Sequence, residues 1–137
     1  MKSLYESLLD DFDTLNSNID PKKEIKLFIE DNYSGEYEIS AKPNKDGLYE
    51  VSAKKRISVK NTNITTLTND LFIWDKIGGD FDCSYCNSLT SLKGAPKEVK
   101  GAFDCSYCDS LTSLEDAPKE IGRSFYCSFC SSNIPPR

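Results

Sequence analysis

The chain has 137 residues, of which 38% are hydrophobic and 28% charged, and its net charge is −5 at pH 7. This length suits one domain with a hydrophobic core, and the composition is that of a folded protein. The acidic balance argues against nucleic-acid binding, since phosphate contacts need a basic patch. No apolar run has the length of a membrane span, and the acidic start "MKSLYESLLDDF" does not resemble a signal peptide. We therefore expect a cytoplasmic protein with no membrane partner.

Two helical patterns come first along the chain. Apolar residues recur every three or four positions over residues 3–15, namely Leu4, Leu8, Phe12 and Leu15. A second helix is expected after Asp20, which suits an N-cap, with Pro21 at its first position and Asn32 and Gly35 ending it. Its buried face would consist of Ile25, Phe28 and Ile29. The patterns predict two short helices joined by a turn.

Alternating apolar residues follow and predict a β-hairpin. They flank a turn rich in Pro, Asn, Asp and Gly, with Tyr37, Ile39 and Ala41 before it and Tyr49, Val51 and Ala53 after it. Ile57 and Val59 continue the chain in an extended form. We expect residues 1–56 to form a cap of helices and hairpin, and residues 57–137 to form a separate repetitive unit.

That repetitive unit has a period of 22 residues. The period relates three phenylalanines, Phe81, Phe103 and Phe125, and three cysteine pairs, Cys83 and Cys86, Cys105 and Cys108, and Cys127 and Cys130. It also relates four leucines, Leu89, Leu92, Leu111 and Leu114. An imperfect earlier copy contains Ile64 and Leu67. A fixed period of this length is typical of a solenoid, and about three turns are expected.

One unit reads Val/Ile, Phe-x-Cys-Ser-x-Cys, Leu-x-x-Leu and Ala-Pro, which resembles a leucine-rich repeat. Because side chains alternate along a strand, one set of repeat positions is expected to face the core. That set is Phe81, Cys83, Cys86, Leu89, Leu92, Phe103, Cys105, Cys108, Leu111, Leu114, Phe125 and Cys127. The cysteines would then be small core side chains whose S–H groups donate to carbonyls inside the coil.

The wording "CSYCNSLTSLKGAPKEVKGAF" is similar to that of short leucine-rich-repeat proteins of Bacteroides-group gut bacteria and their phages. The resemblance extends from about Asp20 to the end, but this chain has fewer turns than its longer relatives. It implies an α+β fold in which N-terminal helices and a β-hairpin cap a short leucine-rich-repeat-like solenoid. The expected turns number about three, each of 22 residues.

Zinc binding is the main alternative interpretation of the cysteines. Two Cys-x-x-Cys pairs separated by 18 residues are typical of a structural zinc site. However, the chain has no histidine, three pairs leave one over, and a zinc ribbon has no need of leucines at fixed spacing. A redox pair would require a helix start, whereas the first cysteine of each pair lies in an expected strand. We therefore expect no cofactor and no metal, and keep a module stabilised by zinc on four cysteine ligands as an alternative.

Catalytic motifs are missing from the sequence. There is no histidine, no phosphate-binding Gly-x-x-x-x-Gly-Lys loop and no Gly-x-Ser-x-Gly nucleophile turn. Asp80 and Asp82 in "GGDFD" are better explained as solvated turn residues than as a calcium site. We expect a protein that is not an enzyme.

The outward positions of the repeat are expected to form three columns. They are Asp82, Asp104 and Tyr126; Ser84, Ser106 and Ser128; and Tyr85, Tyr107 and Phe129. Exposed aromatic residues beside acidic ones are typical of a binding face, although the rings could instead simply cover the turns and shield the cysteines. Trp74 is expected in the core, where the cap meets the solenoid.

These observations favour a protein–protein interaction module. With the phage resemblance, a concrete version is an accessory protein that binds and blocks a host protein, such as one of a defence system. The alternative from a different class is a self-associating structural protein, in which the C-terminal edge near Phe125–Cys127 pairs with another copy.

Overall fold

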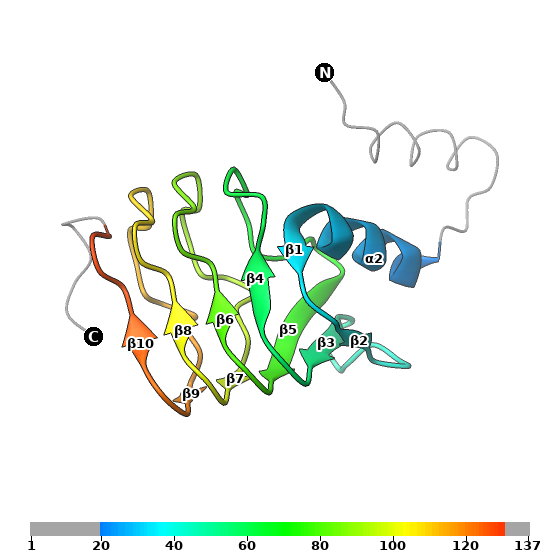
Figure 1. Ribbon diagram of the computed structural model, residues 1–137. Helices are drawn as coiled ribbons and strands as arrows, with labels where there is room; N and C mark the ends of the chain where they lie inside the picture. The colour runs from blue at the N-terminus through cyan, green and yellow to red at the C-terminus, as the bar shows by residue number, and fades with distance from the viewer. Residues whose placement is uncertain (1–19, 131–137) are drawn as a thin grey trace, which may run out of the picture.

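The computed structural model describes residues 20–130, so the helix expected over residues 3–15 lies outside the described part. Within it, one helix, α2 (Pro21–Asn32), precedes ten short strands that wind into a β-solenoid (Figure 1). The strands are β1 (Tyr33–Ser34), β2 (Glu38–Ile39), β3 (Tyr49–Ala53), β4 (Ile57–Val59), β5 (Phe72–Ile77), β6 (Phe81–Asp82), β7 (Glu98–Val99), β8 (Phe103–Asp104), β9 (Glu120–Ile121) and β10 (Phe125–Tyr126).

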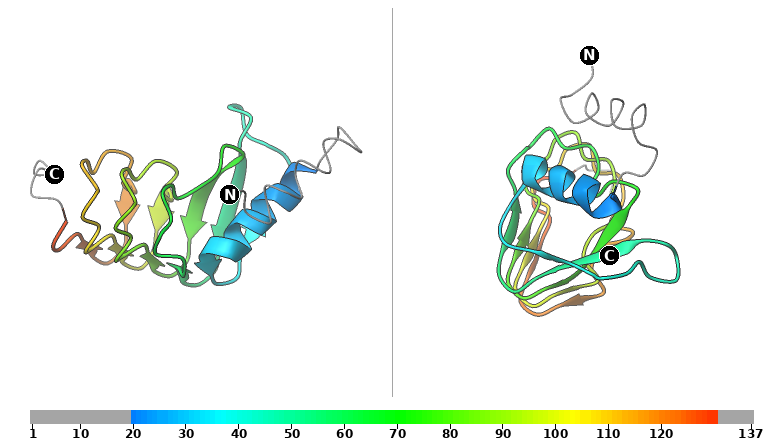
Figure 2. Two further views of the ribbon diagram at one scale, coloured as in Figure 1. Left: turned by 90° about the horizontal axis from the view of Figure 1, so that it is seen from above. Right: turned by 90° about the vertical axis from the view of Figure 1, so that its right-hand side faces the viewer.

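The strands form two sheets that run along the solenoid. One has the order β1-β4-β6-β8-β10 and the other the order β2-β3-β5-β7-β9. Each coil contributes one strand to each sheet, and successive coils pair in parallel, with Phe81 opposite Phe103 and Phe103 opposite Phe125. The 22-residue period of the sequence is therefore the step from one coil to the next (Figure 2).

Residues 20–130 contain about four coils rather than the expected three. The additional coil consists of β3 and β4, because β3 pairs in parallel with β5 and β4 pairs in parallel with β6. The expected hairpin is confirmed, since β2 and β3 are antiparallel with Ile39 opposite Val51. Its second strand, however, also belongs to the solenoid. The strands β3, β5, β7 and β9 give each of the four coils a second strand, which the resemblance to a leucine-rich repeat did not lead us to expect.

Helix α2 covers the N-terminal end of the solenoid (Figures 1 and 2). It begins as expected, with Pro21 in its first turn and the Asp20 carboxylate accepting a hydrogen bond from the Lys22 amide at 3.0 Å. Ile25 and Ile29 are buried. Within residues 20–130, no helical segment has the length and hydrophobicity needed to cross a bilayer.

The core contains a column of aromatic rings, which we call the inner column, formed by Phe81, Phe103 and Phe125. Ring centroids are 5.8 Å apart between Phe81 and Phe103 and 5.5 Å apart between Phe103 and Phe125. Trp74 is fully buried, 5.0 Å from the Tyr33 ring and 5.7 Å from the Phe81 ring. It therefore lies where the cap meets the coils, as expected.

The expected core positions are buried in the inner coils and only half-buried in the last one. The fully buried members are Phe81, Cys83, Cys86, Leu89, Leu92, Phe103, Cys105, Cys108 and Leu111. The half-buried members are Leu114, Phe125 and Cys127. The difference follows from position, because no further coil among the described residues covers the fourth one.

Candidate interaction surface

Three aromatic residues occupy the same unusual turn conformation in successive coils. Tyr85, Tyr107 and Phe129 have φ values of 62°, 59° and 58°. This left-handed region is uncommon for residues other than glycine, asparagine and aspartate. Since the same conformation recurs in the last three coils, the three side chains leave the solenoid in the same direction.

The three rings form a continuous stack, which we call the aromatic ladder. Tyr85 and Tyr107 have ring centroids 4.6 Å apart and planes inclined by 3°, and Tyr107 and Phe129 are 4.9 Å apart with an inclination of 17°. The residues are 58%, 38% and 72% exposed, respectively. Because neighbouring rings cover each other's faces, the ladder presents its ring edges to solvent. The outer face of Phe129 has no stacked partner among residues 20–130.

The aspartates of the next column help to build the turns that carry the rings. Asp82 lies opposite Asp104 in the sheet, and Asp104 lies opposite Tyr126, as expected from the period. The Asp82 carboxylate accepts a hydrogen bond from the Ser84 amide, and that of Asp104 accepts one from the Ser106 amide, both at 2.9 Å. Such a bond two residues ahead stabilises a tight turn.

The two aspartates differ in their electrostatic environment. Arg56 donates to the Asp82 carboxylate at 2.7 Å and also contacts Asp80 at 3.3 Å, so Asp82 is already paired. Asp104 forms no ion pair with another described residue. Asp104 is therefore the carboxylate beside the ladder that remains available to a cationic partner.

The serine column does not form an exposed face throughout. Ser84 is half-buried, whereas Ser106 is only 7% exposed, so the expectation that Ser106 lies on the outer surface is wrong. The fourth coil covers it, and the Ser106 hydroxyl accepts a hydrogen bond from the Ser128 amide at 3.1 Å. Of the residues in the three expected columns, those that are exposed are Tyr85, Tyr107, Tyr126, Ser128 and Phe129.

Beneath the ladder, the cysteine thiols connect neighbouring coils. The Cys108 thiol donates to the Cys83 carbonyl with a sulfur–oxygen distance of 3.2 Å, and the Cys130 thiol donates to the Cys105 carbonyl at 3.0 Å. All six cysteines are free. The expectation that their S–H groups meet carbonyls inside the coil is confirmed for these two residues.

The environment of Cys83, Cys105 and Cys108 keeps these three thiols neutral. Burial raises the pKa of Cys83 and of Cys105 well above the usual thiol value, and a hydrogen bond with Cys86 together with burial does the same to the pKa of Cys108. A nucleophile or a metal ligand requires the thiolate form. Among residues 20–130, no group of three or more His, Cys, Asp or Glu side chains is arranged to hold a metal ion.

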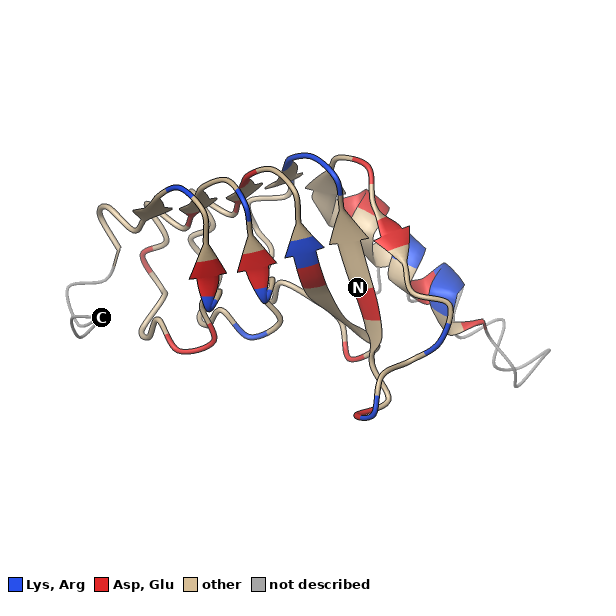
Figure 3. Cartoon of the chain, turned by 90° about the horizontal axis from the view of Figure 1, so that it is seen from below, with Lys and Arg blue, Asp and Glu red and all other residues tan. Residues whose placement is uncertain are grey.

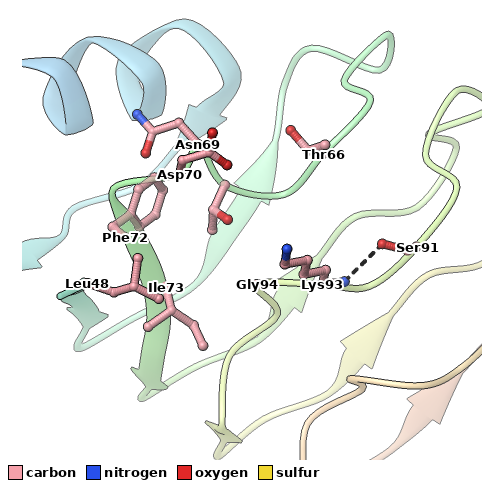
Figure 4. Close-up of a pocket in the computed structure, with 10 residues that line it drawn as sticks. Leu48, Thr66, Asn69, Asp70, Phe72, Ile73, Ser91, Lys93 and Gly94 are labelled. Carbon is pink, nitrogen blue, oxygen red and sulfur yellow. Dashed lines mark hydrogen bonds between the residues drawn. The ribbon is translucent and has the colours of Figure 1, made fainter. Parts of the chain in front are cut away.

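A small pocket of about 260 Å³ lies at the irregular segment between the first two coils (Figure 4). Its lining includes Thr66, Asp70, Phe72 and Lys93, and the Lys93 amide donates to the Ser91 hydroxyl at 3.2 Å. Sequence reasoning missed this pocket because residues 60–71 match the repeat only imperfectly.

The sheet on another side of the solenoid has charges of both signs (Figure 3). Lys76 lies opposite Glu98, and Glu98 lies opposite Glu120. The Lys97 ammonium group contacts the Glu50 carboxylate at 2.8 Å. These cross-coil pairs are typical of a solvated sheet face and do not form a patch of one sign.

No protein-family model, curated protein or solved structure matches this chain. Function is therefore inferred from the surface and its chemistry.

Proposed function

We propose that the protein is a non-enzymatic protein–protein interaction module and that the aromatic ladder is its contact surface. The observation that supports this most is the stack of Tyr85, Tyr107 and Phe129, which remains exposed although its members are large aromatic residues. Aromatic side chains dominate the binding energy of protein interfaces. A ring already held by its neighbours loses little conformational freedom on binding, so the cost of association is reduced.

The chemistry of the ladder favours a partner segment with apolar and basic side chains. Ring edges pack well against aliphatic groups and against the faces of other rings. The Asp104 carboxylate next to the ladder, together with the net charge of −5, favours arginine or lysine on the partner. Binding should therefore weaken as the salt concentration rises.

The resemblance to repeat proteins of gut bacteria and their phages favours a host protein as the partner. In this version the module occupies a surface of a host defence protein and blocks it. The relation to leucine-rich repeats belongs to the same proposal, and it is supported by the buried positions of Leu89, Leu92 and Leu111.

The test is affinity capture from a host lysate, followed by a binding measurement with the purified partner. The double variant Tyr85→Asn and Tyr107→Asn removes both rings, and asparagine tolerates the left-handed backbone better than most residues. The matched control is Tyr85→Phe with Tyr107→Phe, which preserves the stack. We expect the asparagine variant to lose the partner and the phenylalanine variant to retain it.

Circular dichroism and thermal unfolding of both variants establish that each is folded. A partner that binds the folded asparagine variant as tightly as the wild type would show that the ladder is not the contact surface. The rings would then be covers for the turns and the thiols below them. Failure to recover any ladder-dependent partner from the host would count against the proposal as well.

A further inference from the structure

We propose that the pocket at the irregular segment between the first two coils binds a small zwitterion, namely a free α-amino acid with an apolar side chain. The site is separate from the aromatic ladder, and its ligand is a small molecule rather than a partner protein. Three features of the pocket support it: the insertion that forms the pocket, two charged side chains without ion-pair partners, and the apolar residues beside them.

An insertion in the repeat forms one wall of this pocket. Ile77 follows Leu67 by ten positions, whereas Val99 follows Leu92 by only seven, so the segment that leads into β5 has three extra residues. In repeat proteins such insertions form loops on one face of the solenoid, and that face is often the binding face. The insertion therefore gives this corner of the solenoid a shape that the later repeats do not specify.

The length of β5 explains why a gap is left beside it. β5 has six residues, whereas β7, its neighbour in the next coil, has two. Lys76 and Ile77 pair with β7, so no described strand lies opposite Phe72 and Ile73 on that side. The chain that precedes β7, residues 91–94, forms the opposite wall (Figure 4).

Gly94 allows the two walls to touch. It has a φ of 88°, and a Cβ atom added to it would lie 2.5 Å from Thr68 Oγ1, so any other residue would push the insertion away. The equivalent residue of the next coil, Asp116, has a similar φ of 70° without being glycine. Glycine is therefore needed at position 94 for space. The contact makes the pocket part of the packed fold, and sites for small molecules are usually formed in advance in this way.

Two side chains of opposite charge line the pocket without neutralising each other. Asp70 and Lys93 come from opposite walls (Figure 4), and neither forms an ion pair with another described residue. By contrast, Lys97 on the neighbouring sheet face is paired with Glu50. A zwitterion carries an ammonium group and a carboxylate in one molecule, so it complements both walls at once. A ligand with a single charge would leave one of the two side chains unpaired.

Apolar residues line the pocket beside the two charges. Leu48, Phe72 and Ile73 belong to this part of the lining (Figure 4), and the Phe72 side chain is fully packed into the core. Sites for small molecules combine an apolar lining with a few polar groups that fix the orientation of the ligand. The apolar side chain of the amino acid packs here, while its ammonium group faces Asp70 and its carboxylate faces Lys93.

The volume of the pocket suits a ligand of this size. Pockets for drug-sized molecules measure about 300–1,000 Å³. The volume of about 260 Å³ found here is below that range. A single amino acid therefore matches the pocket better than a nucleotide, whose phosphates would also meet the unpaired Asp70 carboxylate.

Titration of the full 137-residue chain with L-leucine, followed by two-dimensional NMR of the backbone amides, tests the proposal. Leucine from about 1 to about 50 mM covers the millimolar affinity expected of so small a ligand. We expect shifts confined to amides around the pocket, such as those of Thr68, Ile73 and Gly94. N-acetyl-L-leucine lacks the ammonium group and L-leucine amide lacks the carboxylate, so each should bind about two- to fivefold more weakly.

Two variants identify which wall recognises which group. Asp70→Asn should bind leucine about as weakly as the wild type binds N-acetyl-leucine, and the two changes together should cost little more than either alone. Lys93→Gln should behave in the same way toward leucine amide. The matched control is Glu115→Gln, which removes an exposed charge at the position equivalent to Lys93 one coil further on and should leave the affinity for leucine unchanged. The same spectra show that each variant is folded.

An absence of shifts at about 50 mM leucine would overturn the proposal, as would equal binding of leucine and both analogues. Tighter binding of a neutral sugar such as glucose would overturn it as well, because the charges would then not select the ligand. Shifts at Tyr85 and Tyr107 in place of the pocket amides would show that leucine binds elsewhere. None of these results bears on the aromatic ladder, whose test measures a partner protein.

Discussion

Two stacks of aromatic rings with the same spacing in the sequence run through this solenoid, one inside it and one outside. The inner column is buried over most of its length, and its ring centroids are 5.8 and 5.5 Å apart. The aromatic ladder is exposed, with centroids 4.6 and 4.9 Å apart and a left-handed backbone at every ring. The repeat period therefore determines which residues stack on each other. Whether a stack points into the core or into solvent determines whether it stabilises the fold or is available to a partner.

The buried thiols lie beside the inner column of phenylalanines. Cys83 and Cys105 are fully buried beside the phenylalanines, and Cys108 donates to a carbonyl of the preceding coil. Substitutions of the inner column or of the buried cysteines should therefore alter the free energy of unfolding. Changes to the ladder should alter binding with little effect on stability.

The largest effect is expected from raising the pH. The folded-state pKa of Cys83 and of Cys105 is raised by burial above the unfolded value of about 8.5, so each thiol stabilises the fold fully below that pH and the stabilisation is lost as the pH rises further. At about pH 10 each thiol that remains protonated in the folded state should contribute a loss of about 2 kcal/mol, which amounts to about 6 kcal/mol for Cys83, Cys105 and Cys108 together. Urea unfolding at a series of pH values from about 7 to about 10 measures this loss.

The control for the pH series is Cys105→Ala, which should show a shallower decline above about pH 8.5 because it has one fewer titrating thiol. If the wild type keeps its stability to the alkaline end of the series, the cysteines are not neutral core groups. A variant with the same pH slope as the wild type would lead to the same conclusion for Cys105.

Truncation of the inner column should have the next largest effect. Phe103 is fully buried between two other rings, so Phe103→Ala should lower the free energy of unfolding by about 3–5 kcal/mol. The equivalent removal in the ladder, Tyr107→Asn, should cost less than about 1 kcal/mol, as is usual for exposed positions. Denaturant unfolding of both variants gives the comparison, and equal losses would refute the assignment of different roles to the two stacks.

A smaller effect is expected from the thiol hydrogen bonds. Cys108→Ala removes the bond to the Cys83 carbonyl and leaves a small cavity, which should cost about 1–3 kcal/mol. Cys130→Ala removes the corresponding bond at the half-buried end and should cost less, since solvent can replace the donor there. A larger loss for Cys130 would show that the C-terminal end is more tightly packed than the core.

The last prediction concerns the rate at which the thiols react with a reagent, and it involves the smallest change in stability. Cys127 and Cys130 are half-buried, whereas the other four cysteines are buried. An aromatic disulfide reagent should therefore modify at most two thiols rapidly in the native protein and all six after denaturation. Rapid modification of Cys83 or Cys105 in the native state would contradict the packing described for the inner side.

The fold could be inferred from the sequence where the repeat motif is complete. The first coil, which lacks the motif, was not predicted. The 22-residue step predicted the register of Phe81, Phe103 and Phe125, which the sheets confirm. The first coil carries no "CSxC" stretch, and its alternating residues indicate a strand without showing whether a parallel partner follows. For this reason β3 was assigned to a hairpin alone and one turn was not counted.

The candidate surface could be predicted only in outline. Spacing placed Tyr85, Tyr107 and Phe129 in one column, but a left-handed backbone at tyrosine is rare and has no signal in the sequence. The burial of Ser106 could not be foreseen either, because it depends on a hydrogen bond from Ser128 in the next coil. These features arise from contacts between coils, which a local pattern does not describe.

The central claim is that the repeated cysteine pairs are free thiols that pack within a solenoid and do not bind metal. The most direct test is the zinc content of protein purified under reducing conditions without added metal, combined with urea unfolding in the presence and absence of a chelator. We expect no stoichiometric zinc and one cooperative transition that the chelator does not change. Stoichiometric zinc that is lost together with folding would contradict the claim and make the three "CSxC" stretches a metal framework.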